Sequence, residues 1–281
     1  QIFRLPIDEI QLEDITLLGR IDPQKTVFKL EDFSLKLENR YNSLWIDLSA
    51  PSAFMKPAGP FNPIQFQVDA RGLVEEDQIR LTALKVKRND SYLISSGFFW
   101  GDISKAKITS SEMASKLLVN LSSLKDWVAA FQPERKIPYM EGIANLSSTS
   151  GFKDKVPYLN LKLDGEGIVF DRYNIGNVRM NGTLEKSAIK SLEGEIQNSS
   201  GKLLLQNFSM NLDGDYDLKV KASPNVEVSQ FLHSIGLPKI PLKAQLSGTV
   251  QCEGKLKEKL LLNCEQAQAQ VRGFHLFAPK D

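Results

Sequence analysis

The stretch NFSMNLDGDYDLKV, residues 207–220, contains two runs of alternating apolar and polar residues separated by Asp213-Gly214. Apolar side chains occupy every second position, which is typical of a β-strand with one buried face. An Asp-Gly pair between two such runs is a strong signal for a tight hairpin turn. The stretch therefore predicts two antiparallel strands, each with one apolar and one polar face.

The same alternation continues through most of the chain. It recurs at residues 33–37, 44–48, 64–68, 159–163, 178–180 and 242–246. Asp164-Gly165 and Asn181-Gly182 are predicted to form turns in the same way, so that strands recur about every 8–12 residues. This spacing predicts roughly eighteen to twenty strands stacked along one axis, in a single long curved sheet.

Three segments interrupt the strand pattern. A loop near residues 50–63 is predicted from Pro57, Pro60 and Pro63, because proline breaks a strand ladder. Two short amphipathic helices are predicted from apolar residues at helical spacing. Their apolar faces consist of Leu124, Trp127, Val128 and Phe131 in the first helix, and Val228, Phe231, Leu232 and Ile235 in the second.

The two predicted helices have start and stop signals of their own. Ser123 and Asp126 resemble a capping box at the start of the first helix. Proline or glycine follows both helices and would end them. Helices this short must be held by packing on the sheet. An alternative role for Trp127 and Phe131 is contact with a membrane surface.

An internal repeat spans the two helices. The tripeptide KIP occurs at residues 136–138 and again at 239–241, an offset of 103 residues (239 − 136), and Gly151 and Gly254 keep this offset. A repeat of helix, Ile-Pro and alternating strands implies elongation by stacking. The predicted organisation is an N-terminal β segment (1–114), a repeat unit with a short helix (115–223) and a second, truncated repeat unit (224–281).

Composition excludes several classes of function. The chain has 281 residues, 42% of them hydrophobic, which argues against disorder. Its 35 basic and 34 acidic residues form no basic stripe, so no nucleic-acid partner is expected. No apolar run reaches the length of about eighteen residues that indicates a membrane helix. Because the chain starts at Gln1 without a signal peptide, we expect a fragment whose targeting or anchoring segment is missing.

Catalytic and metal-binding motifs are missing from the sequence. It contains no nucleophile elbow and no phosphate-binding glycine loop. Its two histidines, His233 and His275, have no ligand at metal-site spacing. Asp213, Asp215 and Asp217 open like a calcium loop, but the glycine and glutamate that should follow are absent. We therefore expect a protein that is not an enzyme and that has no cofactor and no metal.

The two cysteines lie in the last hairpin-like segment. Cys252 and Cys264 fall on strand faces that would oppose each other if residues 254–258 form the turn. A cross-strand disulfide would then form in an oxidising compartment. The alternative is two small buried apolar side chains, and the sequence does not separate the two.

Five segments of the chain resemble the TamB and AsmA-like proteins of the bacterial envelope. They are LVNLSSL (118–124), IPYMEG (137–142), YLNLKLDG (158–165), VRMNGTL (178–184) and GKLLLQNFSMNLDG (201–214), and the resemblance extends over about residues 115–276. It implies a U-shaped β-groove with an apolar interior, which acts as a bridge-like lipid transfer protein. It also implies a periplasmic location, an inner-membrane anchor outside this chain, and phospholipid movement toward the outer membrane. The TamB branch additionally implies an outer-membrane barrel assembly protein as a partner.

Together, the alternation and the resemblance predict an elongated, curved, antiparallel-rich all-β sheet with two short helices, forming a U-shaped apolar groove that holds phospholipid acyl chains. Each buried methylene would contribute about 0.8 kcal/mol, and a uniform lining would let a chain slide. The predicted lining residues are Leu159, Leu161, Leu163, Val178, Met180, Leu203, Leu205, Phe208, Met210, Leu212, Leu218, Val220, Leu246, Val250, Leu260 and Leu262.

Two other functions are compatible with the sequence. The first is a structural or interaction scaffold, such as an outer-membrane or autotransporter assembly factor, in which the apolar face is filled by the protein's own side chains. The second is an enzyme that acts on envelope polysaccharide, which would need two carboxylates about 5–10 Å apart in a cleft. The first alternative predicts a dry core, and the second predicts glycan cleavage.

Overall fold

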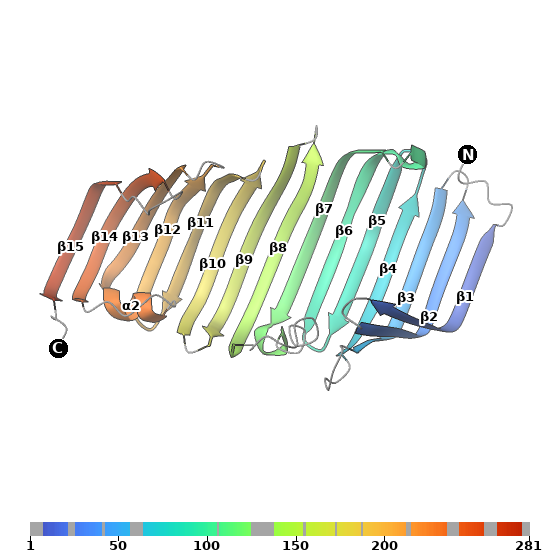
Figure 1. Cartoon of the computed structure of the whole chain (residues 1–281), viewed down its shortest axis with the longest axis horizontal. Helices are drawn as coiled ribbons and strands as arrows, with labels where there is room; N and C mark the ends of the chain where they lie inside the picture. The colour runs from blue at the N-terminus through green and yellow to red at the C-terminus, as the bar shows by residue number, and fades with distance from the viewer. Residues whose placement is uncertain are drawn as a thin grey trace. The chain divides into compact units, whose positions relative to one another are not determined.

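The structure is a computed structural model, shown in Figure 1. It describes residues 8–21, 26–40, 43–56, 64–105, 107–124, 138–153, 156–171, 173–186, 188–211, 215–234, 242–255 and 263–276. For β13, β14 and β15 only the backbone and its strand register are described. The chain forms two compact units: unit 1 is Gln1–Pro138 with Ser147–Pro157, and unit 2 is Tyr139–Leu146 with Tyr158–Asp281.

Strands account for nearly all of the regular structure. They are β1 (Glu9–Ile21), β2 (Thr26–Arg40), β3 (Ser43–Lys56), β4 (Ile64–Val74), β5 (Gln78–Arg88), β6 (Ser91–Asp102), β7 (Lys107–Asn120), β8 (Met140–Lys153), β9 (Val156–Phe170), β10 (Tyr173–Glu185), β11 (Ala188–Asn198), β12 (Gly201–Met210), β13 (Asp215–Glu227), β14 (Leu242–Lys255) and β15 (Asn263–Leu276). A 3-10 turn, η1 (Ile103–Lys105), and one helix, α2 (Val228–Ser234), complete the described elements.

Each unit is an antiparallel meander in which every strand pairs with its neighbours in the chain. In unit 1 the pairs run in order from β1 to β7. In unit 2 they run in order from β9 to β15. The predicted fold class, an antiparallel all-β protein with very little helix, is confirmed. The U-shaped groove stays a prediction.

Two of the predicted turns are wrong. Asp164-Gly165 lies inside β9 and Asn181-Gly182 lies inside β10. A Cβ atom on Gly165 would come within 3.0 Å of the Ile168 side chain, so this glycine makes room for a neighbour instead of forming a turn. The strands therefore run for 10 to 15 residues, and the described chain holds fifteen strands, fewer than predicted. Asp213-Gly214 lies outside the described residues.

Residues with positive φ follow three of the strands, where the chain turns back. Asn89, with φ of 49°, follows β5, and the pairing of Arg88 with Ser91 leaves a two-residue turn. Asp171 and Lys186, with φ of 56° and 51°, follow β9 and β10. Asparagine and aspartate tolerate the left-handed region because their short polar side chains bond locally.

The predicted loop near residues 50–63 begins later than expected. Strand β3 continues through Pro51 to Lys56. Its register with β4 skips from Ala50 to Ala53, so Pro51 lies in a bulge, where a missing N–H group costs no ladder bond. The stretch with the three other prolines, 57–63, lies outside the described residues.

The bulge in β3 has counterparts in β1 and β2. Asp14 and Asp32 have φ of 53° and 52°, and each lies where the register of its strand shifts or skips. An extra residue in a strand reverses which face the odd-numbered and even-numbered side chains take beyond it. Apolar residues at even positions on one side of a bulge and at odd positions on the other side therefore lie on the same face. In β2 this applies to Leu30 before the bulge and to Phe33 after it. Figure 1 shows the blue strands at this end of unit 1 bending out of the direction of their neighbours.

The helix predicted at residue 228 is confirmed as α2. Phe231 is 1% exposed, so its side chain anchors the helix. Asn198 Nδ2 donates a hydrogen bond to Ser234 Oγ at 2.7 Å, and Ser234 Oγ donates to the Phe231 carbonyl at 2.6 Å. Of the predicted apolar positions, Ile235 lies outside the described residues.

The first predicted helix starts three residues earlier than expected. Residues 121–124 are already helical, and Asn120 Oδ1 accepts a hydrogen bond from the Ser122 backbone N–H at 3.2 Å. Asn120 is therefore the cap, and the prediction of Ser123 is wrong, because a cap must precede the first helical residue. Trp127, Val128 and Phe131 lie outside the described residues.

Candidate functional site

Strand pairing in unit 2 aligns apolar residues into rows that run across the strands. Paired residues in an antiparallel sheet lie on the same face, so each chain of pairs defines such a row. The rows are Leu159–Leu184–Ile189–Met210, Leu161–Gly182–Leu192–Phe208, Leu163–Met180–Gly194–Leu205 and Gly165–Val178–Ile196–Leu203. We call these four cross-strand rows the unit 2 apolar face.

The unit 2 apolar face contains nine of the predicted lining residues. They are Leu159, Leu161, Leu163, Val178, Met180, Leu203, Leu205, Phe208 and Met210. By backbone register, Leu218, Val220 and Val250 continue these rows, because Leu218 pairs with Phe208, Val220 with Leu205 and Val250 with Val220. Leu246 pairs with Val226 beyond a register shift. Leu212, Leu260 and Leu262 lie outside the described residues.

Unit 1 carries a similar apolar face that the lining prediction missed. Its rows are Ile10–Leu37–Ile46–Gly72–Leu81, Leu12–Leu35–Leu48–Ala70–Leu84 and Ala50–Val68–Val86–Leu93–Leu117. The signal was present in the alternation of residues 33–37, 44–48 and 64–68. The predicted lining contains only residues within the part of the chain that resembles the TamB and AsmA-like proteins, from about residue 115. We call these three rows the unit 1 apolar face.

Most side chains in these rows are only half-buried. The buried apolar side chains among those described are Phe33, Ala50, Ala53, Met55, Ile64, Leu73, Val119, Val178 and Phe231. Val178 is the one buried member of the nine lining residues above, and the other eight are intermediate. In a sandwich, a second sheet would cover such a face and bury it. Within the described part of each unit, no second layer covers the rows.

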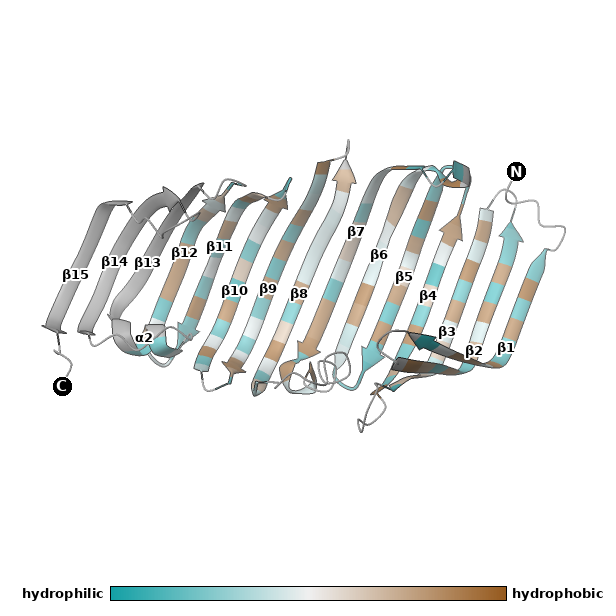
Figure 2. Cartoon of the chain, viewed as in Figure 1, coloured by the Kyte–Doolittle hydropathy of each residue, from teal (hydrophilic) through white to brown (hydrophobic). Residues whose placement is uncertain are grey.

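The opposite faces of both units carry charged and amide side chains. Figure 2 shows the apolar and polar residues alternating along the described strands. In unit 2, Asp164 lies 3.5 Å from Lys162 and 3.9 Å from Arg179, and Lys202 lies 2.8 Å from Glu195. These pairs are at least partly exposed, so each contributes little to stability but keeps this face wet.

A close polar partner shifts the pKa of four of the described side chains. The hydrogen bond from Arg40 lowers the pKa of Glu38, and the same contact raises the pKa of Arg40. A hydrogen bond to Asp102 raises the pKa of Lys105, and one to Glu141 raises the pKa of Tyr139. Each shift stabilises the ordinary protonation state of its group at neutral pH.

The remaining candidate residues lie away from the apolar rows or are described by backbone alone. Cys252 of β14 lies between the pairs Gln251–Gln266 and Glu253–Asn263, so the register brings it beside residues 264–265. His233 is exposed in α2, with its ring centroid 5.8 Å from that of Tyr173. Among the described side chains, no group of three or more His, Cys, Asp or Glu residues could hold a metal ion.

A membrane-crossing helix is absent from the described part of the chain. Comparison of the chain with protein-family models, with curated proteins and with solved structures found no match in any of the three.

Proposed function

We propose that this chain holds or conducts phospholipid acyl chains along the unit 1 and unit 2 apolar faces. The observation that supports the proposal most strongly is that these rows remain half-buried with no second layer over them. An apolar face of several adjacent rows is unfavourable in water unless something apolar covers it. An acyl chain is long, narrow and apolar, and it matches a row that crosses successive strands.

The energetics of the proposal need no chemical step. Each buried methylene contributes about 0.8 kcal/mol, so a long acyl chain is held firmly. Neighbouring strands lie about 4.8 Å apart and present similar residues, so a shift by one strand changes the free energy little. Uniform lining of this kind permits movement along a row, whereas a single deep pocket would trap the lipid.

The setting of the proposed function comes from the sequence resemblance to TamB and AsmA-like proteins. On that basis we propose a periplasmic protein attached to the inner membrane through a segment outside this chain. Phospholipid would move toward the outer membrane, where a barrel assembly protein would be the partner. This part of the proposal fails independently of lipid binding if the protein fractionates away from the envelope.

A second candidate function is a protein-interaction scaffold, which the open edge of unit 1 favours. Among the described residues, β1 pairs only with β2, and its other edge is free for another strand. Leu18 of β1 is 73% exposed. The bulge at Asp14 opposes this role, because bulges and charges are how proteins protect sheet edges from pairing.

Adjacent leucines in β12 provide a matched test. Leu205 belongs to the unit 2 apolar face, whereas Leu204 pairs with Glu195 on the polar face. Both side chains are half-buried. We expect Leu205→Asp to abolish phospholipid retention and Leu204→Asp to preserve it, as measured by lipid extraction and native mass spectrometry of protein purified from cell envelopes.

Two controls keep this experiment decisive. Circular dichroism must show unchanged β content for both variants. If Leu205→Asp does not fold, a photo-crosslinking residue at Leu161 should capture lipid and one at Lys162 should not, because they lie on opposite faces of β9. Equal lipid retention in both aspartate variants, or a lipid-free wild-type protein, would reject the lipid proposal and favour the scaffold.

A further inference from the structure

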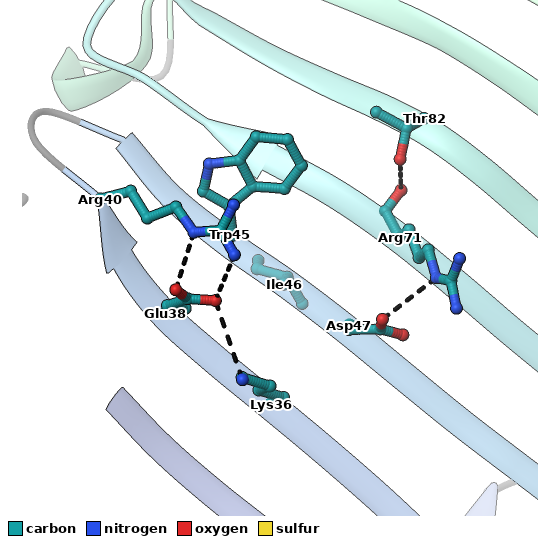
Figure 3. A pocket seen from close by; sticks show the side chains of 8 residues that line it. All are labelled: Lys36, Glu38, Arg40, Trp45, Ile46, Asp47, Arg71 and Thr82. Carbon is teal, nitrogen blue, oxygen red and sulfur yellow. Dashed lines mark hydrogen bonds and ion pairs between the residues drawn. The ribbon is translucent and has the colours of Figure 1, made fainter. Parts of the chain in front are cut away.

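The polar face of unit 1 contains a depression that the lipid proposal does not use. It lies over β2 to β5 and has a volume of about 380 Å³ (Figure 3). This volume falls in the range of about 300–1,000 Å³ that is typical of small-molecule sites. The lining residues are Lys36, Glu38, Arg40, Trp45, Ile46, Asp47, Arg71 and Thr82.

Strand register gathers the charged side chains and Trp45 on one face, whereas Ile46 belongs to a row of the unit 1 apolar face. Glu38 of β2 pairs with Trp45 of β3, and Lys36 pairs with Asp47. Asp47 in turn pairs with Arg71 of β4. These pairs have the opposite parity to the rows of the unit 1 apolar face, so the depression and that apolar face lie on opposite sides of the sheet.

A network of ion pairs fixes the polar groups of the depression. Arg40 binds Glu38 through two contacts, Nε to Oε1 at 2.7 Å and Nη2 to Oε2 at 2.8 Å. Arg71 Nε lies 3.0 Å from Asp47 Oδ2, and Lys36 Nζ lies 3.8 Å from Glu38 Oε2. A two-point guanidinium–carboxylate contact restricts both side chains, so the groups are oriented before a ligand arrives.

Thr82 fixes the backbone at the other side of the depression. It occupies the bulge in β5 where the register with β4 shifts. Its Oγ1 donates a hydrogen bond to the Arg71 carbonyl at 2.9 Å. This contact satisfies a carbonyl at the shifted position and holds the Arg71 segment in place.

The charges of the network cancel. Three cations, Lys36, Arg40 and Arg71, are matched by Glu38 and Asp47 within the depression and by Glu9, which lies 3.3 Å from Lys36. An anion would meet cations that are already neutralised, whereas phosphate sites usually present an excess of positive charge. The balance therefore favours a neutral ligand that can both donate and accept hydrogen bonds.

Trp45 adds a broad apolar surface to this polar setting. It is 38% exposed, and the Arg40 guanidinium lies 5.2 Å from its ring centroid. Figure 3 shows the indole standing beside the Glu38–Arg40 pair, with the Asp47–Arg71 pair further along the strands. The exposed part of the ring offers a flat apolar surface to a ligand in the depression.

We propose that this depression binds a neutral sugar unit of a glycan chain, stacked on Trp45 and hydrogen-bonded to Glu38, Asp47 and Arg71. A pyranose has an apolar C–H face that suits an aromatic ring and a rim of hydroxyl groups that both donate and accept hydrogen bonds. Carboxylates accept from these hydroxyls, and guanidinium groups donate to them. The site is on the opposite face from the proposed lipid rows and does not depend on them.

The test uses neutral hexasaccharides of glucose, of mannose and of N-acetylglucosamine as separate probes. Binding to the full chain is followed by tryptophan fluorescence and by calorimetry. We expect at least one of the three to bind, with an affinity that changes less than about twofold between 50 and 500 mM NaCl, because the ligand carries no charge. Trp45→Ala should lower the affinity about tenfold or more.

Trp100 provides the matched control. It is 36% exposed and lies on the same face of unit 1, outside the depression. Trp100→Ala should leave the affinity within about twofold. Asp47→Asn removes one charge with little change of shape and should weaken binding as well, so the proposal stays testable if Trp45→Ala does not fold.

Three outcomes would overturn the sugar proposal. The first is failure of all three hexasaccharides to bind. The second is equal loss of affinity in Trp45→Ala and Trp100→Ala, which would place binding elsewhere. The third is binding of inorganic phosphate alone, with strong weakening by salt, which would make the depression an anion site.

Discussion

Strands β2 and β3 of unit 1 and strands β9 to β12 of unit 2 treat the same apolar alternation differently. Near the bulges of β2 and β3 the apolar side chains are buried: Ala50 and Ala53 are 0% exposed and Ile64 is 2% exposed. In β9 to β12 the rows stay half-buried. The difference teaches that alternation produces an apolar face, whereas local backbone geometry decides whether the protein's own side chains cover that face.

The largest expected effect tests this contrast directly. Ile64 packs with Met55 and Phe66, so Ile64→Ala should lower the free energy of unfolding by about 2–5 kcal/mol. Leu161→Ala removes a half-buried side chain and should cost roughly half as much or less. Urea unfolding of both variants measures the difference. Equal costs would show that the rows of unit 2 are packed as tightly as the bend.

The second prediction concerns the backbone of the bend. Asp32 has φ of 52°, a conformation that β-branched residues avoid. Asp32→Val should destabilise unit 1 by about 1–3 kcal/mol, whereas Asp32→Gly should change stability by less than about 1 kcal/mol. Thermal unfolding of the two variants checks this. If the valine variant were as stable as the glycine variant, the bulge at Asp32 would not explain the buried apolar residues of unit 1.

The third prediction asks whether unit 2 supports its bulges in another way. Gly167, with φ of 59°, donates its backbone N–H to Asn177 Oδ1 at 3.0 Å. Asn177→Ala should therefore cost about 1 kcal/mol in urea unfolding, from the loss of this hydrogen bond. Asn181→Ala, at a position of the same parity in β10, serves as the control and should cost less. If both variants lowered the free energy of unfolding equally, the Asn177 side chain would have no stabilising role of its own.

The smallest effect is a titration on the polar face of unit 1. The hydrogen bond from Arg40 lowers the pKa of Glu38 below its ordinary value of 4.5. A lowered carboxyl pKa means that the stabilisation by this pair is present above pH 4.5 and is lost as the pH falls through the folded-state pKa. Carboxyl NMR should show Glu38 titrating below 4.5 in the wild type and closer to 4.5 in Arg40→Gln. An unchanged pKa in the variant would contradict the assigned cause.

Local patterns predicted some elements well and others poorly. The apolar spacing of Val228 and Phe231 predicted α2, because a helical face is a short-range pattern. Asp164-Gly165 and Asn181-Gly182 carried the same local signal as a hairpin turn. Their place inside strands follows from the neighbours Ile168 and Leu192, whose side chains occupy the space that a Cβ atom would fill. Short-range patterns do not contain that information.

The candidate sites show the same division. Nine predicted lining residues fall in one set of rows. Alternation fixes the face of those in β9 and β10, whereas in β12 a register shift between Leu205 and Phe208 brings residues of opposite parity to the same face. The unit 1 rows also required a bulge, since Leu81 and Leu84 of β5 differ in parity and reach the same face through the register shift between them. The depression at Trp45 required the pairing of four strands, and no single segment of the sequence indicates it.

The sequence by itself determined an antiparallel all-β chain with one apolar and one polar face, because the period of two is a property of each strand alone. Only the tertiary structure decided the strand lengths, the bulges, the register that aligns leucines into rows, and the ion pairs that surround Trp45. Most of these features depend on contacts between residues far apart in the chain, for example the pairing of Arg71 with Asp47. Such contacts form only after the strands have paired, so no local pattern could specify them.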